Sequence, residues 1–155
     1  MQLERESWMR ALMAHPPTQI KTLAARLSEG MDVLLTQLPQ AGLGLLTLRD
    51  GAFDEAFYLG EFPLSVCRVE LVVADGQRAA GGAQVMADDA ELARALAILD
   101  ALLAARIPGW EIVESLVDAG QALCRQTASR RNAMLAATRV DFAMLNNSED
   151  EDEDA

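Results

Sequence analysis

The stretch Val66–Arg106, VCRVELVVADGQRAAGGAQVMADDAELARALAILDALLAAR, contains the pattern that decides the fold. Its first eight residues alternate between an apolar set and a set that includes two charged residues, which is typical of a strand in a sheet with one wetter face. The apolar set is Cys67, Val69, Leu71 and Val73, and the other set is Val66, Arg68, Glu70 and Val72. Asp75-Gly76 is a strong hairpin turn, so we expect a return strand over about Arg78–Met86. Gly81-Gly82 weakens this strand and favours a bulge more than a ligand contact. The stretch therefore begins with an antiparallel pair.

A long helix is predicted directly after this pair. Either Asp88 or Asp89 can cap its first turn, and the helix extends to about Arg106. Leucines at helical spacing form one apolar stripe along it, namely Leu92, Leu96, Leu99 and Leu103. After Pro108-Gly109, the segment Trp110–Val117 fits both an extended and a helical conformation. Asp118 could then cap a last helix.

The residues before Val66 predict three more strands. Val33–Leu35 and Gly42–Leu48 are apolar runs separated by a turn at Pro39-Gln40. Ala56–Gly60 is a further short strand after another turn. The sheet is therefore predicted to be a mainly antiparallel β-meander of about five strands.

The N-terminal part predicts an αα-hairpin. Apolar residues at helical spacing in Glu4–Ala14 indicate a short helix that ends at His15-Pro16-Pro17. A second helix begins near Pro17 and ends at Gly30, a residue that readily adopts the left-handed stop. Two helices, a meander and two more helices predict one α+β domain over residues 1–145.

Most of the net charge of −11 comes from the C-terminal segment. Six of the 24 acidic residues lie in Glu149–Asp154, so the other 18 against 13 basic residues leave the body at −5. We expect residues 146–155 to be a disordered, solubilising acidic tail. This charge balance disfavours nucleic acid and anionic membranes as partners. No apolar stretch is long enough for a signal peptide or a membrane span, which predicts a cytoplasmic protein.

The sequence lacks the residues of a self-contained active site. His15 is the one histidine, and it is best explained as a surface or capping residue. Cys67 and Cys124 lack CxxC spacing and are expected to be buried, reduced thiols. Gly42-Leu43-Gly44 lacks the following helix of a phosphate loop and fits strand glycines better. We therefore expect no catalytic triad and no metal site.

Two features suggest binding. Arginines make the last helix the most basic segment, and guanidinium groups bind phosphate through paired donors, although a solvated helix face is the simpler explanation. These residues are Arg125, Arg130, Arg131 and Arg139. The chain is also 51% hydrophobic with 5% aromatic residues. Such a composition fits either a Leu- and Ala-rich core or an obligate interface, and we expect the isolated chain to self-associate.

The whole chain up to about Leu145 resembles the PhnG family, the G subunit of the bacterial carbon-phosphorus lyase core complex. The similarity lies in the order of short segments, with Ala87-Asp88-Asp89 departing from the family's Gly-Arg-Asp. The matching segments are Trp8-Met9, Leu23–Leu27, Gly42-Leu43, Phe57–Glu61, Arg68–Leu71, Asp75-Gly76, Gly81, Ala97–Leu102 and Thr138–Phe142.

This resemblance implies a mainly structural subunit of a phosphonate-processing enzyme. The complex transfers phosphonate to the ribose anomeric carbon of ATP and releases adenine, with the H and I subunits and functionally the L subunit; the J subunit belongs to the same core. ATP is thus a substrate of the complex, and no cofactor is expected on this chain. Candidate partner or anion contacts are Glu61, Arg68, Arg125, Arg130, Arg131 and Arg139. The alternatives are a regulatory domain that binds a phosphometabolite through Arg125, Arg130 and Arg131, and a stand-alone enzyme.

Overall fold

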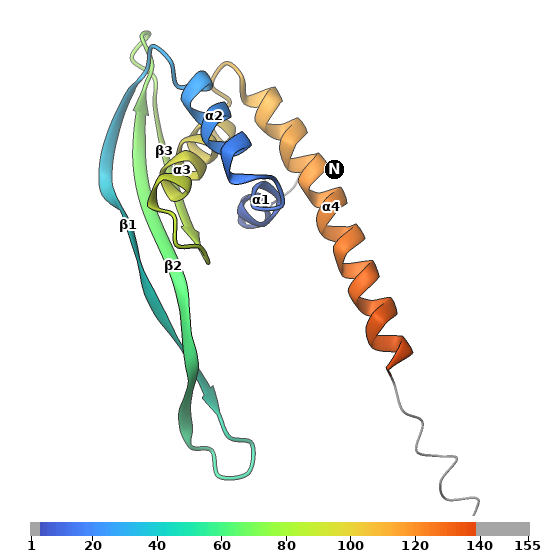
Figure 1. Ribbon diagram of the computed structural model, residues 1–155. Coiled ribbons are helices and arrows are strands. Elements are labelled where there is room, and N and C mark those ends of the chain that lie inside the picture. The colour runs from blue at the N-terminus through green and yellow to red at the C-terminus, as the bar shows by residue number, and fades with distance from the viewer. Residues whose placement is uncertain (1–3, 139–155) are drawn as a thin grey trace, which may run out of the picture.

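The computed structural model describes residues 4–138 and shows an α+β fold. Helix pairs precede and follow an antiparallel sheet, as the sequence predicts (Figure 1). The predicted acidic tail and Arg139 lie outside the described residues. The elements in chain order are α1 (Arg5–Leu12), α2 (Pro17–Leu27), β1 (Asp32–Arg49), β2 (Ala56–Val72), β3 (Arg78–Val85), α3 (Ala90–Ala105) and α4 (Trp110–Ala137).

The described residues form a three-stranded sheet in the order β1-β2-β3, so the predicted meander of five strands is not confirmed. The expected turn at Pro39-Gln40 lies inside β1, where the pairing with β2 shifts in register but continues. Ala56–Gly60 and the strand expected from Val66 are parts of one strand, β2. β1 is an edge strand, and such a strand tolerates proline because one of its sides has no ladder to interrupt. A register irregularity absorbs the extra residue.

Helix α3 is the centre of the core. It covers one face of β2 and β3, and α2 and α4 pack against its other sides, so it is buried almost all round. The sheet contributes alternate residues of β2, among them Cys67 and Val69. At Gly81 a Cβ would collide with the carbonyl oxygen of Ala97 and would lie 2.7 Å from the Cβ of Ala101. The predicted weak point in β3 is therefore the place where α3 touches the sheet backbone.

The start of α3 is fixed by Asp89. Its Oδ1 accepts a hydrogen bond from the Leu92 amide at 2.9 Å, which confirms Asp89 and not Asp88 as the cap. Its Oδ2 accepts from Lys21 Nζ at 2.7 Å and thereby ties α2 to α3. The pKa of Asp89 lies below its usual value, mainly because of the Lys21 hydrogen bond and then the Leu92 amide. The ionised carboxylate is thus part of the fold.

Helix α4 is one continuous helix. Trp110–Val117 is helical, and Asp118 lies within α4, so the predicted cap at Asp118 is wrong. The helix begins after Gly109, whose φ is +99°, a conformation that glycine adopts without strain. A Cβ at Gly120 would collide with the carbonyl oxygen of Ala11, so α1 and α4 also touch through their backbones.

Candidate functional site

The first exposed feature is a two-stranded arm, which we define as residues 40–64. In this range β2 pairs with β1 alone, because its pairing with β3 begins at Ser65. The arm extends well past the helices (Figure 1). An isolated two-stranded hairpin is marginally stable in water. The arm therefore receives little support from the other described elements.

The arm exposes large apolar side chains and almost no charge along its strands. No charged residue occurs from Val33 to Leu48, and Glu61 is the one charge from Ala56 to Cys67. Natural edge strands are usually protected by charges, and large exposed apolar patches mark interaction sites. Side chains of the arm that are between 39% and 78% exposed are Leu43, Leu45, Leu46, Leu48, Phe53, Phe57, Tyr58 and Leu59.

The two faces of the arm differ. Leu43 pairs with Pro63 and Leu45 with Glu61, and strand alternation puts these four on the face that α3 covers within the body. On the opposite face, the ring of Phe62 lies over Gly44, where a Cβ would clash with it. The side toward the helices therefore presents exposed leucines around Glu61.

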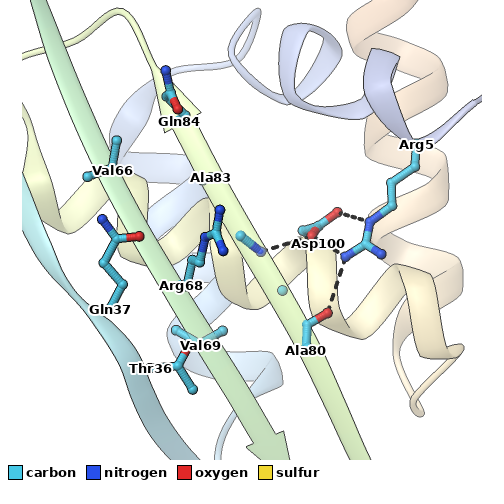
Figure 2. Close-up of a pocket in the computed structure, with 12 residues that line it drawn as sticks. Arg5, Thr36, Gln37, Val66, Arg68, Val69, Ala80, Ala83, Gln84 and Asp100 are labelled. Carbon is cyan, nitrogen blue, oxygen red and sulfur yellow. Dashed lines mark hydrogen bonds and ion pairs between the residues drawn. The ribbon is translucent and has the colours of Figure 1, made fainter.

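A groove that runs across the three strands to the outer edge of β3 contains, at that edge, an ion pair between Arg5 of α1 and Asp100 of α3 (Figure 2). Arg5 Nε donates to Asp100 Oδ1 at 3.0 Å and its Nη2 to Oδ2 at 2.6 Å, and these bonds raise the pKa of Arg5. The Gly82 amide also donates to Asp100 at 3.0 Å, while Arg5 donates to the Ala80 carbonyl oxygen at 3.2 Å. These bonds satisfy backbone groups that an edge strand leaves open. The pair is therefore structural.

A third feature is the basic groove between α1 and α4, about 760 Å³ in its larger part. Cys124, Ala128, Arg131 and Leu135 recur at spacings of three or four and form one face of α4. Arg10 of α1 stands opposite them. The lining of this larger part is Arg10, Met13, Ala14, Leu123, Cys124, Thr127, Ala128, Arg131, Asn132 and Leu135. Arg125 lines the adjoining hollow together with Ser7, Arg10, Ala11, Gln121, Cys124 and Ala128.

The sequence matches a known family over nearly its whole length. The family is described as phosphonate metabolism protein PhnG, and the match covers residues 3–146. The chain belongs to the PhnG family. This confirms the resemblance predicted from the short segments and gives the PhnG protein a role in phosphonate metabolism. No curated protein matches the chain.

In this PhnG protein the predicted contact residues do not form one site. Glu61 lies on the arm, whereas Arg68 of β2 lines the groove that also contains the Arg5–Asp100 pair, from which it is separated by β3 (Figure 2). Of the predicted arginines, Arg125 and Arg131 border the basic groove, whereas Arg130 is exposed on α4 and lines neither hollow. Arg139 lies outside the described residues.

Sequence reasoning missed Arg10, which completes the basic groove of the PhnG protein, because its approach to α4 is seen only in the packed fold. It also predicted that both thiols are buried. Cys67 is buried, and burial raises its pKa, but Cys124 is half-exposed in the groove. His15 donates from Nε2 to the Leu116 carbonyl oxygen at 2.8 Å, which joins the end of α1 to α4.

In residues 4–138, no group of three or more His, Cys, Asp or Glu side chains is placed to hold a metal ion. The same residues include no helix with the length and apolar character needed to cross a membrane.

Proposed function

We propose that this PhnG protein is the G subunit of a carbon-phosphorus lyase core complex and serves mainly in its assembly. With the H and I subunits, and functionally the L subunit, it supports transfer of phosphonate to the ribose anomeric carbon of ATP with release of adenine. The J subunit is a further partner in the core. ATP reaches the reaction as a substrate of the complex, and this chain holds no cofactor of its own.

The arm carries this proposal. Its strands expose leucines and aromatic side chains around a single carboxylate, Glu61, and the described residues add no third strand to this hairpin. Burying such a surface against a partner removes apolar area from water and supports the two strands at the same time. Obligate interfaces have this apolar character. Such an arm is expected of a subunit that functions only within an assembly.

The paired charges at the helix starts and sheet edges support a structural role. Asp100 holds Arg5 and the β3 edge, and Asp89 caps α3 and holds Lys21. Each of these carboxylates therefore has a function in the fold. Their contacts connect the N-terminal helices to α3 and the sheet, which gives the arm a rigid base.

Co-expression with the H, I and J subunits tests the proposal. We expect the wild-type chain to co-elute with them in sizing, and the double variant Leu43→Lys/Leu45→Lys to elute apart, because it places two charges on the apolar face of the arm. Ala25→Lys, at an exposed position of α2, is the matched control and should assemble. If the wild-type chain elutes alone while its partners assemble, or if the double variant assembles normally, the proposal is wrong.

A phosphometabolite-binding role is the second candidate. One observation favours it: Arg10, Arg125 and Arg131 border adjoining hollows, and guanidinium groups bind phosphate well. Thermal-shift measurements with ATP and methylphosphonate on the isolated chain test this role. A rise in melting temperature that disappears in Arg131→Ala supports it, and no rise with either ligand rejects it.

A further inference from the structure

The second half of α4 has no buried residue in the described part of the chain. The buried residues of α4 end at Gly120, and beyond it the helix extends past α1 (Figure 1). Leu123, Met134 and Leu135 are exposed on it by 42%, 72% and 59%. Helices of this kind gain most of their stability from packing of an apolar face, so this half is incomplete in the isolated chain.

The charge of this half has one sign. From Gln121 to Ala137 the charged residues are Arg125, Arg130 and Arg131. Within residues 4–138, neither Arg125 nor Arg131 forms an ion pair, nor does Arg10 across the groove. Arg125 has a long hydrogen bond of 3.4 Å to the Gln121 side chain. The basic groove therefore offers guanidinium groups whose donors are largely unused.

The shape of the basic groove favours an extended partner element over a small anion. Its lining runs along α4 from Gln121 to Leu135, which corresponds to roughly 21 Å of helix axis. Arg125 and Arg131 are separated by roughly 9 Å along this axis, so their guanidinium groups can serve successive carboxylates of an extended partner. Between the cations the groove is lined by apolar side chains such as Met13 and Ala128.

We propose that the basic groove binds an acidic amphipathic helix of a partner subunit. The apolar face of that helix covers Met13, Leu123 and Leu135, and its carboxylates pair with the guanidinium groups of Arg10, Arg125 and Arg131. Because the unpaired charges of the groove are guanidinium groups, the element that binds there should be acidic. The length of the groove corresponds to about four helical turns. This inference rests on the proposed function, because it needs an assembly, but it concerns a different surface from the arm.

The chain contains its own reporter for this groove. Cys124 is half-exposed on the groove wall, and Cys67 is fully buried beneath α3 with a raised pKa. We expect iodoacetamide to alkylate Cys124 in the isolated chain, measured where sizing shows a monomer, at least tenfold faster than in the assembled complex. Cys67 should react slowly in both states and thus report whether the fold is intact.

A charge reversal identifies the contact. Arg131→Glu should weaken retention in the complex at least tenfold and restore alkylation of Cys124. Arg130→Glu makes the same change at the neighbouring residue, outside the lining of the groove, and should behave like the wild type. Equal effects of the two variants would overturn the inference, since the contact would then be a general field effect.

The remaining outcomes separate this inference from the proposed function. A complex that forms while Cys124 reacts at the rate of the free chain overturns the inference and leaves the assembly role standing. Failure of the complex to form rejects both. Protection of Cys124 in the free chain by ATP or methylphosphonate assigns the groove to a small anion. Protection that disappears when the six acids of Glu149–Asp154 become amides assigns it to this chain's own acidic segment.

Discussion

Removing Arg5 should destabilise the fold much more than removing a comparable exposed arginine. In Arg5→Ala, the carboxylate of Asp100, whose side chain is 5% exposed, keeps the Gly82 amide as its one described donor. Two charge-assisted hydrogen bonds disappear. A buried charge that loses its partner is costly, because neither water nor another group replaces that partner fully.

The exposure of the pair sets the size of the effect. Breaking a fully buried ion pair costs about 3–5 kcal/mol, but the Arg5 side chain is 53% exposed, so solvent recovers part of that loss. We expect about 2 kcal/mol for Arg5→Ala, or roughly 6 °C in melting temperature for a chain of this size. Asp100→Asn keeps the volume and lets Arg5 rehydrate, so about 1 kcal/mol is expected. The double variant should lose about 2 kcal/mol, less than the sum, because the two residues share one interaction.

Thermal and urea denaturation followed by circular dichroism measure these differences. Arg49→Ala is the control, since its ion pair with Asp54 joins side chains that are 68% and 83% exposed. That control should change stability by less than about 0.5 kcal/mol. If Arg5→Ala and Arg49→Ala give the same small loss, or if the double variant shows strict additivity, the ion pair does not hold the edge of β3 and the reasoning is refuted.

Three further predictions concern the core, acid stability and association. Gly81→Ala should lower the melting temperature by several degrees, because its Cβ meets the Ala97 carbonyl oxygen; Gly82→Ala, with no Cβ contact under 3.5 Å, should cost less, and equal losses would contradict the close approach. The pKa of Asp89 is lowered by Lys21, so its contribution exists above the unfolded value of 3.8 and is lost as the pH falls through the lower folded value. The stability difference between wild type and Asp89→Asn should therefore shrink from pH 5 to pH 3, and a constant difference would reject the linkage. The isolated chain should self-associate in sedimentation velocity and Leu45→Lys should reduce this, whereas a concentration-independent wild-type monomer would show that the exposed leucines do not drive association.

Patterns within a few neighbouring residues were sufficient to predict a turn, a helix cap and an apolar stripe of the fold. The β2–β3 turn at Asp75-Gly76, the cap of α3 and the leucine stripe of α3 are all encoded within a few residues, and the structure has each of them. Strand continuity was not predictable in this way. Pro39-Gln40 has the composition of a turn, but its position on an edge strand, which only the complete sheet defines, lets β1 continue through it.

The surface residues also divide into those that the local sequence predicts and those that only tertiary packing brings together. A run of arginines in the sequence identified Arg125 and Arg131, because a charge bias along one helix is a local property. Arg10 joins them only through the packing of α1 on α4, and Arg5 meets Asp100 across 95 positions of the chain. Side chains brought together by tertiary packing have no periodic signature in a single sequence, so pairs of this kind had to come from the structure.

The arm and the basic groove make different demands on what covers them, and this explains why the chain keeps both. The arm and α4, which forms one wall of the groove, extend from the body in the same direction on opposite sides of it (Figure 1). The strands of the arm offer apolar area with one carboxylate, Glu61, which gives affinity but little specificity, since many apolar surfaces can cover it. The groove offers guanidinium groups that attract carboxylates and repel basic side chains. These charges would determine which partner binds and in which orientation. High salt weakens the second contact and leaves the first, because screening acts on charges and not on apolar burial. An assembly held by both would therefore keep its affinity in salt but lose its ability to select the correct partner.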